Sequence, residues 1–312
     1  QRLSVDQPEL AWAVDGSRYD VELVAAVKRF QVRHGLKADG IVGPDTLTAL
    51  NVPVDARIAQ IRLNMERWRW LPRALGERHV LGNLPAFELT ATVPDQPPLQ
   101  MRVISGRPDR TSPAFQSRIT RLIVNPDWTV PYRLAVQDKL PELKKDPLAL
   151  QARQIHIYRR AGKDLVEVDP REVDWRRYSR RHFPFLLRQE PGANNALGQL
   201  KFDMPNPFDV YIHDTPAKGL FEQTVRTLSS GCIRVEQPVR LASRLLGHDQ
   251  QDTEAWVRAQ MATGEPRSLP LERPVPVYLV YLTAWVDGQG NLQFRNDVYG
   301  RDLQMRDRFT FP

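Results

Sequence analysis

The stretch YIHDTPAKGLFEQTVRTLSSGCIRV, residues 211–235, carries most of the information about this chain. An apolar, strand-like run that starts at Asp209 ends at His213, and Cys232 follows nineteen positions later. The Ser-Ser-Gly of residues 229–231 stands directly before the cysteine, where the freedom of glycine in φ permits a sharp turn. We therefore expect His213 and Cys232 at the edges of secondary-structure elements.

A histidine and a cysteine in this pattern suit nucleophilic catalysis. A thiol with a pKa near ~8.5 is mostly protonated at neutral pH, so it needs a base within hydrogen-bond reach. We predict Cys232 as the nucleophile and His213 as its base. The main-chain N–H groups of Gly231 and Cys232 are candidate oxyanion donors, each worth roughly 3 kcal/mol in hydrolases, and Ser229 and Ser230 would support the turn.

Neighbouring side chains are candidates for supporting and binding roles. A catalytic imidazole needs a partner on its second ring nitrogen. Asp214 is adjacent, but successive strand residues point to opposite faces, so a backbone carbonyl is the better geometric candidate. Arg234 is predicted to hold a substrate carboxylate or to lower the thiol pKa, with a structural ion pair as an equal alternative. Tyr211 is a second candidate for substrate binding.

Cys232 is the only cysteine among 312 residues, which excludes an intramolecular disulfide and any metal site built from several cysteines. A lone cysteine is more often a small buried hydrophobe, and it is the preceding turn and the upstream histidine that favour catalysis. No metal site is predicted. The remaining histidines lack metal-ligand spacing and are not assigned to the site: His34, His79, His156, His182 and His248.

Composition bounds the class of protein. With 41% hydrophobic and 26% charged residues the chain is globular, and no apolar run approaches the ~18 residues of a membrane-spanning helix. The formal charge of +7 favours a polyanionic neighbourhood: nucleic acid, an acidic membrane face or a bacterial wall that carries carboxylates. Because the chain opens with Gln1, we expect that an export signal and an N-terminal scaffold region precede it.

The chain from Tyr19 to Pro53 is predicted to form a small helical unit. Apolar residues recur at helical spacing in VELVAAVKRFQVRHGL and stop at Gly35, and Asp45 is expected to cap the following helix, TLTAL. The stretch from Ala26 to Leu50 closely resembles the peptidoglycan-binding module, whose hallmark is AVKxFQxxxGLxxDGxVGxxTxxAL. The resemblance implies binding to the bacterial wall.

A further helix is expected from Ala56 to Trp70, packing through apolar side chains at Ile58, Ile61, Leu63, Met65 and Trp68. After Pro72 the pattern changes to short β-rich runs such as FELTATV and LQMRVISG. Residues 133–195 turn helix-like and then basic and aromatic, which indicates an insertion near the site. Strand patterns resume at Leu200 and again in VPVYLVYLTAWV.

The segment around Cys232 resembles the L,D-transpeptidase catalytic domain. That family's motif is a histidine, a spacer, then Ser/Thr-His-Gly-Cys-apolar-Arg/Asn, and residues 229–234 here read SSGCIR. Ser230 stands where many members have a second histidine, so that histidine's role does not carry over. The resemblance is closest to the large Gram-negative branch, and rests also on HDTPAKGLF, on residues 125–131 (NPDWTVP) and on residues 195–198 (NALG) with Lys201-Phe202.

The resemblance implies a fold class and a domain order. The class is α+β, with a small helical peptidoglycan-binding domain and a mostly β, sandwich-like catalytic domain that carries a partly helical insertion. The expected boundaries are 1–54 for the binding domain, 55–76 for a helical linker, and 77–312 for the catalytic domain, with 133–195 as an inserted capping subdomain.

The resemblance also implies chemistry and partners. Cys232 would attack the carbonyl of the third residue of a donor tetrapeptide stem, release D-alanine and form a thioester that an acceptor amine resolves. His213 would move the protons. Peptidoglycan stem peptides are the implied partners, carbapenem-type inhibitors are expected to acylate Cys232, no cofactor is implied, and the setting would be periplasmic.

Two other functions remain open at this stage. A related cysteine hydrolase, acting as a carboxypeptidase or endopeptidase, would resolve the same thioester with water. A non-catalytic wall-binding protein would use Cys232 only structurally. Nucleic acid is not expected as a partner, because the basic aromatic stretch from Trp175 to Arg188 lacks a recognised reading motif.

Overall fold

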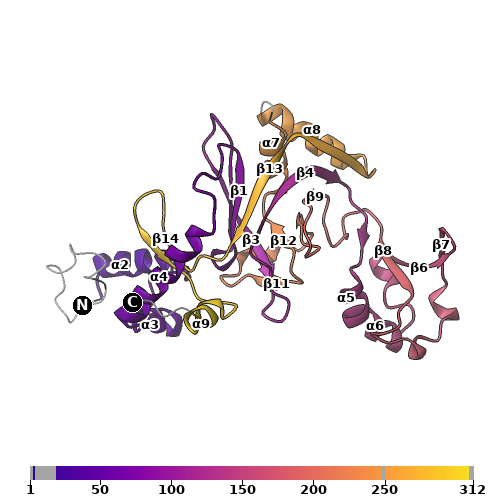
Figure 1. Cartoon of the computed structure of the whole chain (residues 1–312), viewed down its shortest axis with the longest axis horizontal. Coiled ribbons are helices and arrows are strands. Elements are labelled where there is room, and N and C mark those ends of the chain that lie inside the picture. The colour runs from indigo at the N-terminus through magenta and orange to yellow at the C-terminus, as the bar shows by residue number, and fades with distance from the viewer. Residues whose placement is uncertain (1–2, 4–18, 248–249, 309–312) are drawn as a thin grey trace. The chain divides into compact units, whose positions relative to one another are not determined.

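The computed structural model describes residue 3, residues 19–247 and residues 250–308, so His248 and most of the segment before Tyr19 lie outside the described residues. The chain forms two compact units (Figure 1). The first comprises residues 1–116, 219–231 and 276–312, and the second comprises residues 117–218 and 232–275. The strands β4 (Phe115–Val124) and β13 (Arg267–Val280) each have residues in both.

The first unit begins with the predicted helices, which are α2 (Val21–Arg33), α3 (Pro44–Leu50) and α4 (Val54–Arg69). α2 starts at Asp20, whose side chain accepts from the Leu23 amide, and it buries one face. On that face Gln31 bonds to four groups of the following loop and helix: Asp39, Gly40, Ile41 and Thr46. This buried amide folds the loop against α2.

Two expectations about these helices were wrong. Asp45 lies in the first turn of α3, and Gly43 occupies the N-cap, because the fixed φ of Pro44 suits the first helical position. The expected apolar face of α4 is largely solvent-exposed: Ile58, Met65 and Trp68. α4 instead buries Leu63 together with two polar side chains, Asn64 and Arg67.

Strands of the first unit match the β-rich runs after Pro72. They are β1 (His79–Asn83), β2 (Glu88–Thr92), β3 (Leu99–Gly106) and β11 (Thr227–Ser229). β1 pairs antiparallel with β2, β2 antiparallel with β3, and β3 parallel with β11. β1 also pairs in parallel with residues 277–280 of β13.

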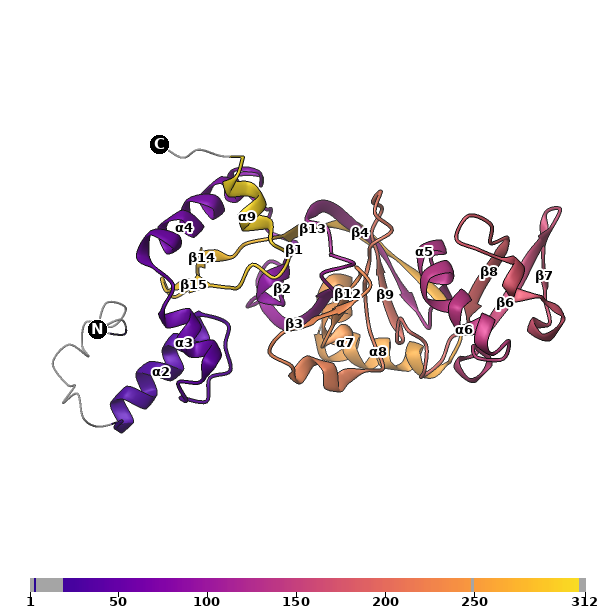
Figure 2. The same ribbon diagram turned by 90° about the horizontal axis from the view of Figure 1, so that it is seen from below.

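The C-terminal part of the first unit packs against α4. It contains the antiparallel pair β14 (Ala284–Val286) and β15 (Leu292–Phe294), followed by α9 (Arg301–Arg306). Figure 2 shows β14 and α9 beside α4, in agreement with the contacts between these elements.

The second unit contains the strand that ends at His213 and the strand that follows Cys232. β4 pairs antiparallel with β9 (Leu200–Asp203), and β9 pairs antiparallel with β10 (Ile212–His213). β10 pairs in parallel with β12 (Ile233–Val235). Two packed helices follow, α7 (Pro238–Leu246) and α8 (Gln250–Ala262).

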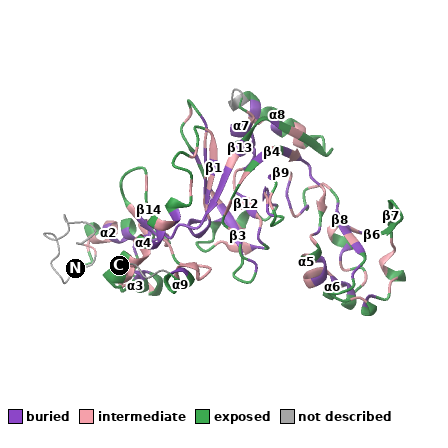
Figure 3. Cartoon of the chain, in the orientation of Figure 1, coloured by how far each residue is buried: buried purple, intermediate pink, exposed green. Residues whose placement is uncertain are grey.

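The expected insertion is a small α/β subdomain within this unit. Its antiparallel sheet has the order β5 (Trp128–Thr129), β8 (Phe185–Gln189), β6 (Ile155–Ala161) and β7 (Asp164–Glu167). A helical run follows β5: α5 (Tyr132–Leu134), a π-helical turn at Ala135–Lys139, and α6 (Leu140–Lys145). Twelve buried side chains, among them Leu143, Trp175 and Leu187, form its own core, whereas β7 is exposed at every position (Figure 3).

The α+β class expected from the sequence is confirmed, with helices at the N-terminal region and strands dominating the rest. Within the described part of the chain, no helix combines the length and the apolar character needed to cross a bilayer.

The separate core of the insertion predicts a local stability effect. Leu187 is fully buried, so Leu187→Ala should destabilise the subdomain by about 2–5 kcal/mol through lost burial and a residual cavity. Leu165 in β7 is 44% exposed, and Leu165→Ala should change stability by less than about 0.5 kcal/mol. Hydrogen exchange of the β6 and β8 amides measures the stability of the subdomain in both variants. Equal protection of these amides in the two variants would contradict a separate core centred on Leu187.

Candidate active site

His213 lies at the end of β10 between two cations on neighbouring strands. It is in register with Lys201 of β9 on one side and with Arg234 of β12 on the other. Cross-strand partners point to the same face of a sheet, so both positive charges flank the imidazole. Tyr211, two residues earlier, lies on this face as well, with its ring centroid 5.7 Å from that of His213.

The imidazole of His213 is buried and neutral. Burial lowers its pKa to about 3, and repulsion from Arg234 and Lys201 contributes in the same direction. Its Nδ1 lies 2.5 Å from the carbonyl oxygen of Asp214. A carbonyl can only accept, so Nδ1 carries the hydrogen, and Nε2 is left with the lone pair that a general base needs.

Cys232 directly precedes β12 on the same face as Arg234. Its Sγ lies 3.9 Å from the Asp209 carbonyl oxygen, and the backbone and hydroxyl of Tyr211 also hydrogen-bond the sulfur. Burial raises the pKa of the Cys232 thiol, although Tyr211 and the charges of Lys201 and Arg234 act to lower it. The resting pair is therefore a neutral thiol and a neutral imidazole.

Asp214 supports the histidine through its backbone, as the alternation of strand faces indicated. Its carboxylate instead accepts from the amides of Gln199, at 3.0 Å, and Thr215, at 2.7 Å, and pairs with Lys218. Gly198 adopts φ +61°, and a Cβ there would lie 2.4 Å from the Asp214 carboxyl carbon. This glycine lets the carboxylate reach the turn before β9.

The Nε of Arg234 is buried and has no hydrogen-bond partner within the described ranges. Among the side-chain nitrogens and oxygens of the described residues, it is the one buried atom of which this is true. Leaving such a donor unsatisfied costs about 1–3 kcal/mol, so the position favours an anionic ligand. A cavity of about 320 Å³ lies beside Lys201 and Tyr211 in the same unit. Its lining includes Trp128, Leu197, Lys201, Asp209 and Tyr211.

The turn before the cysteine belongs to the first unit. Gly231 has φ +123°, and its amide donates to Ser229 Oγ at 3.1 Å, so an oxyanion could use this amide only in place of that bond. Ser229 is buried, whereas Ser230 is exposed and its Oγ lies 3.4 Å from Arg110 Nη1. Ser229, Ser230 and Gly231, the three residues predicted to form a turn before the cysteine, lie in one turn.

Sequence analysis missed the residues that face the pair from other strands. Lys201, Leu197 and Trp128 line the cavity, and Lys201 also flanks His213, where only strand register places it. The alternation of buried Leu200 and Phe202 shows that Lys201 points to the opposite face. The alternation does not tell which side chain of a neighbouring strand Lys201 lies beside.

A family model described as "L,D-transpeptidase catalytic domain" matches residues 77–276, more than half of the chain. The chain belongs to the L,D-transpeptidase family. A second model, described as "Putative peptidoglycan binding domain", matches residues 8–50. Both resemblances expected from the sequence are thereby confirmed.

Relatives of the L,D-transpeptidase family share part of the chain. A Haemophilus influenzae protein named "Putative L,D-transpeptidase" is 36% identical over 246 residues, which is 79% of this chain and 48% of that protein. The chain thus spans about half the length of this curated relative.

Two solved structures of transpeptidases are far less similar. L,D-transpeptidase 3 from Mycobacterium tuberculosis is 11% identical, with a TM-score of 0.30 and coverage of 65% of this chain and 60% of that one. An L,D-transpeptidase from Stackebrandtia nassauensis is 14% identical, with a TM-score of 0.29 and coverage of 89% and 88%.

No group of three or more His, Cys, Asp or Glu side chains in the described part of the chain is arranged to hold a metal ion.

The neutral resting pair predicts the pH dependence of thiol alkylation. The pKa of His213, lowered to about 3, leaves the imidazole deprotonated throughout the neutral range, so the rate with iodoacetamide should show no inflection near the usual histidine pKa of about 6.5. Because burial raises the thiol pKa, the rate should still be rising at about pH 9.

His213→Asn is the matched control, and it should leave this profile unchanged in shape because a neutral histidine adds no charge. A rate that reaches its plateau below about pH 7 would reveal a thiolate–imidazolium pair and contradict the neutral pair.

Proposed function

We propose that this member of the L,D-transpeptidase family cross-links peptidoglycan through a thioester on Cys232. Cys232 attacks the carbonyl of the third residue of a donor tetrapeptide stem, D-alanine leaves, and an acceptor amine on another stem resolves the thioester. The observation that carries this proposal is the buried, neutral His213, whose Nδ1 lies against the Asp214 carbonyl and whose Nε2 would accept the thiol proton.

The charge arrangement stabilises the thiolate and favours release of the proton from His213 to the leaving amine. As Cys232 attacks, its proton moves to His213, and Lys201 and Arg234 stabilise the negative charge that develops on sulfur. An imidazolium between two cations is unfavourable, so His213 readily passes the proton to the leaving amine of D-alanine. The neutral imidazole is then ready to deprotonate the acceptor amine.

We assign the donor carboxylate to Arg234. The unsatisfied Nε of Arg234 and the ammonium of Lys201 face the side of the sheet where the thiol lies. Stem peptides carry carboxylates at and near the cleaved residue, and a guanidinium binds carboxylate with charge-assisted hydrogen bonds. Tyr211, in contact with the sulfur and with the cavity, would pack against the donor chain.

The proposed domain division is 1–54, 55–76 and 77–312, with 133–195 as the capping subdomain. The separate core of that subdomain supports its assignment as a distinct element. The match to a peptidoglycan-binding domain and the charge of +7 support action at the anionic wall, and hence a periplasmic location. Carbapenems, as acylating inhibitors, would react with Cys232.

Product analysis tests this function. With tetrapeptide muropeptides, the wild-type chain should release D-alanine and form cross-linked dimers, and a carbapenem should add its mass covalently. Cys232→Ala should abolish all three results, because no other thiol is present. Shortened stems without dimers would instead identify a hydrolase, and full activity of Cys232→Ala would overturn the thioester mechanism.

The role of Arg234 predicts a binding defect. Arg234→Ala removes a charge-assisted contact worth about 1.5–3 kcal/mol, so KM for the donor should rise roughly ten- to hundredfold. Arg240→Ala, at an exposed arginine of α7 that bonds Gln237, should leave KM unchanged. An unchanged KM in Arg234→Ala, with reduced thermal stability, would assign this arginine to structure alone.

A further inference from the structure

Ser112 fixes the carbonyl of the turn that precedes Cys232. Its hydroxyl donates to the Gly231 carbonyl oxygen at 2.7 Å and accepts from the Gly106 amide at 2.9 Å. Ser112 is completely buried. A single hydroxyl thus joins the end of β3 to the turn, and it uses both its proton and a lone pair to do so.

Gly106 is the point where this connection requires a glycine. It is in register with Ser229 of β11, and the Arg107 amide donates to the Ser229 carbonyl at 3.0 Å. A Cβ at Gly106 would lie 2.1 Å from the Arg110 carbonyl oxygen and 2.8 Å from the Ser112 amide. The loop of residues 107–112 therefore folds back directly over the end of β3, which brings Ser112 to the turn.

Tyr299 and Arg301, from the C-terminal segment, hold the other side of the same connection. The Tyr299 hydroxyl donates to the Gly106 carbonyl oxygen at 2.6 Å and lies 3.0 Å from Ser105 Oγ. Arg301 Nη2 donates to the Ser112 carbonyl oxygen at 2.7 Å. Its guanidinium lies 5.0 Å from the Tyr299 ring centroid.

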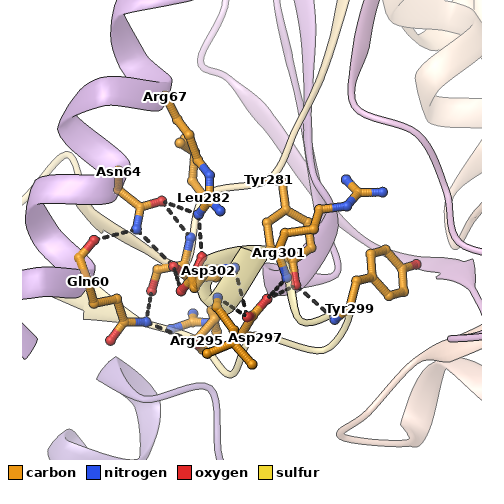
Figure 4. A network of polar contacts seen from close by, with 12 residues as sticks. Gln60, Asn64, Arg67, Tyr281, Leu282, Arg295, Asp297, Tyr299, Arg301 and Asp302 are labelled. Atoms are coloured by element: carbon orange, nitrogen blue, oxygen red, sulfur yellow. Dashed lines mark hydrogen bonds and ion pairs between the residues drawn. The ribbon is translucent and has the colours of Figure 1, made fainter. Parts of the chain in front are cut away.

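This C-terminal segment is itself held by a polar network (Figure 4). Asp297 accepts from the Tyr281 hydroxyl at 2.5 Å and from the Arg301 amide at 2.8 Å, and the Tyr299 amide donates to the Tyr281 hydroxyl at 2.9 Å. Asp302 in turn pairs with the buried Arg67 of α4 at 2.5 Å. The hydroxyl of Tyr299 therefore has little freedom to move.

We infer that Ser112 and Tyr299 are positioning residues that set the turn presenting Cys232. The inference rests on the proposed function, in which Cys232 is the nucleophile. Gly231 has a backbone conformation that L-residues rarely adopt; its carbonyl accepts from Ser112, and Gly106, the strand partner of Ser229, is bonded to both Ser112 and Tyr299. These two side chains hold the main-chain donors of the turn in place for the tetrahedral intermediate.

The test compares two reactions of the same thiol. Alkylation by iodoacetamide forms a sulfur–carbon bond, expels iodide and builds no oxyanion, whereas D-alanine release passes through a tetrahedral oxyanion. Tyr299→Phe keeps the ring and removes only the hydroxyl. We expect D-alanine release from a tetrapeptide muropeptide to fall about five- to hundredfold in kcat, with KM and the alkylation rate unchanged.

Tyr278→Phe is the matched control, because its hydroxyl also donates to one backbone carbonyl of the same unit, that of Leu75 at 3.2 Å, away from the turn. It should retain full kcat. Ser112→Ala should reproduce the Tyr299→Phe defect, and Ser112→Thr, which restores a hydroxyl, should recover part of it.

Each other outcome has a defined meaning. Full kcat in Tyr299→Phe, with Cys232→Ala inactive, would overturn the positioning role and leave the proposed function intact. Equal losses in kcat and alkylation would also overturn it, since they would indicate general unfolding of the turn. Activity in Cys232→Ala would instead contradict the proposed function itself.

Discussion

The site depends on the burial of an uncharged imidazole between two cations. His213 can occupy this position only as a neutral ring, because both burial and the charges of Lys201 and Arg234 oppose a second proton. The Asp214 carbonyl fixes which nitrogen holds the remaining hydrogen. The same two cations act on the neighbouring sulfur in the opposite sense, since they favour its ionised form. One arrangement of charge therefore keeps the imidazole unprotonated and favours the ionised form of the sulfur.

Two parts of the chain supply this arrangement. The second unit provides the histidine, the cations and the thiol on adjacent strands, where register decides which side chains meet. The first unit provides the turn of residues 229–231, whose backbone is bonded to β3 and to the loop of residues 107–112. Gly231 is followed directly by Cys232, so this turn is the segment that leads into the candidate nucleophile.

Sequence patterns were sufficient to nominate the candidate site residues that lie in one local segment. His213, Cys232 and the Ser-Ser-Gly turn could be predicted because strand ends and glycine turns leave local patterns. The backbone partner of the imidazole also followed, from the alternation of strand faces. Lys201 and Ser112 could not be predicted, because their roles arise from register and from a loop that folds back on a strand. On α4, hydrophobic periodicity gave the wrong face, since buried Asn64 and Arg67 satisfy the Thr283 backbone and Asp302 there.

The raised thiol pKa of Cys232 has a consequence outside the reaction cycle. Oxidation by peroxides proceeds through the thiolate, and a resting protein that carries little thiolate is a poor target for it. This matters for a chain with a single cysteine, because a sulfenic acid formed on Cys232 would have no second thiol within the molecule to resolve it. The protonated resting state thus protects the sulfur chemically, and under the proposed function the sulfur becomes reactive only when His213 takes its proton.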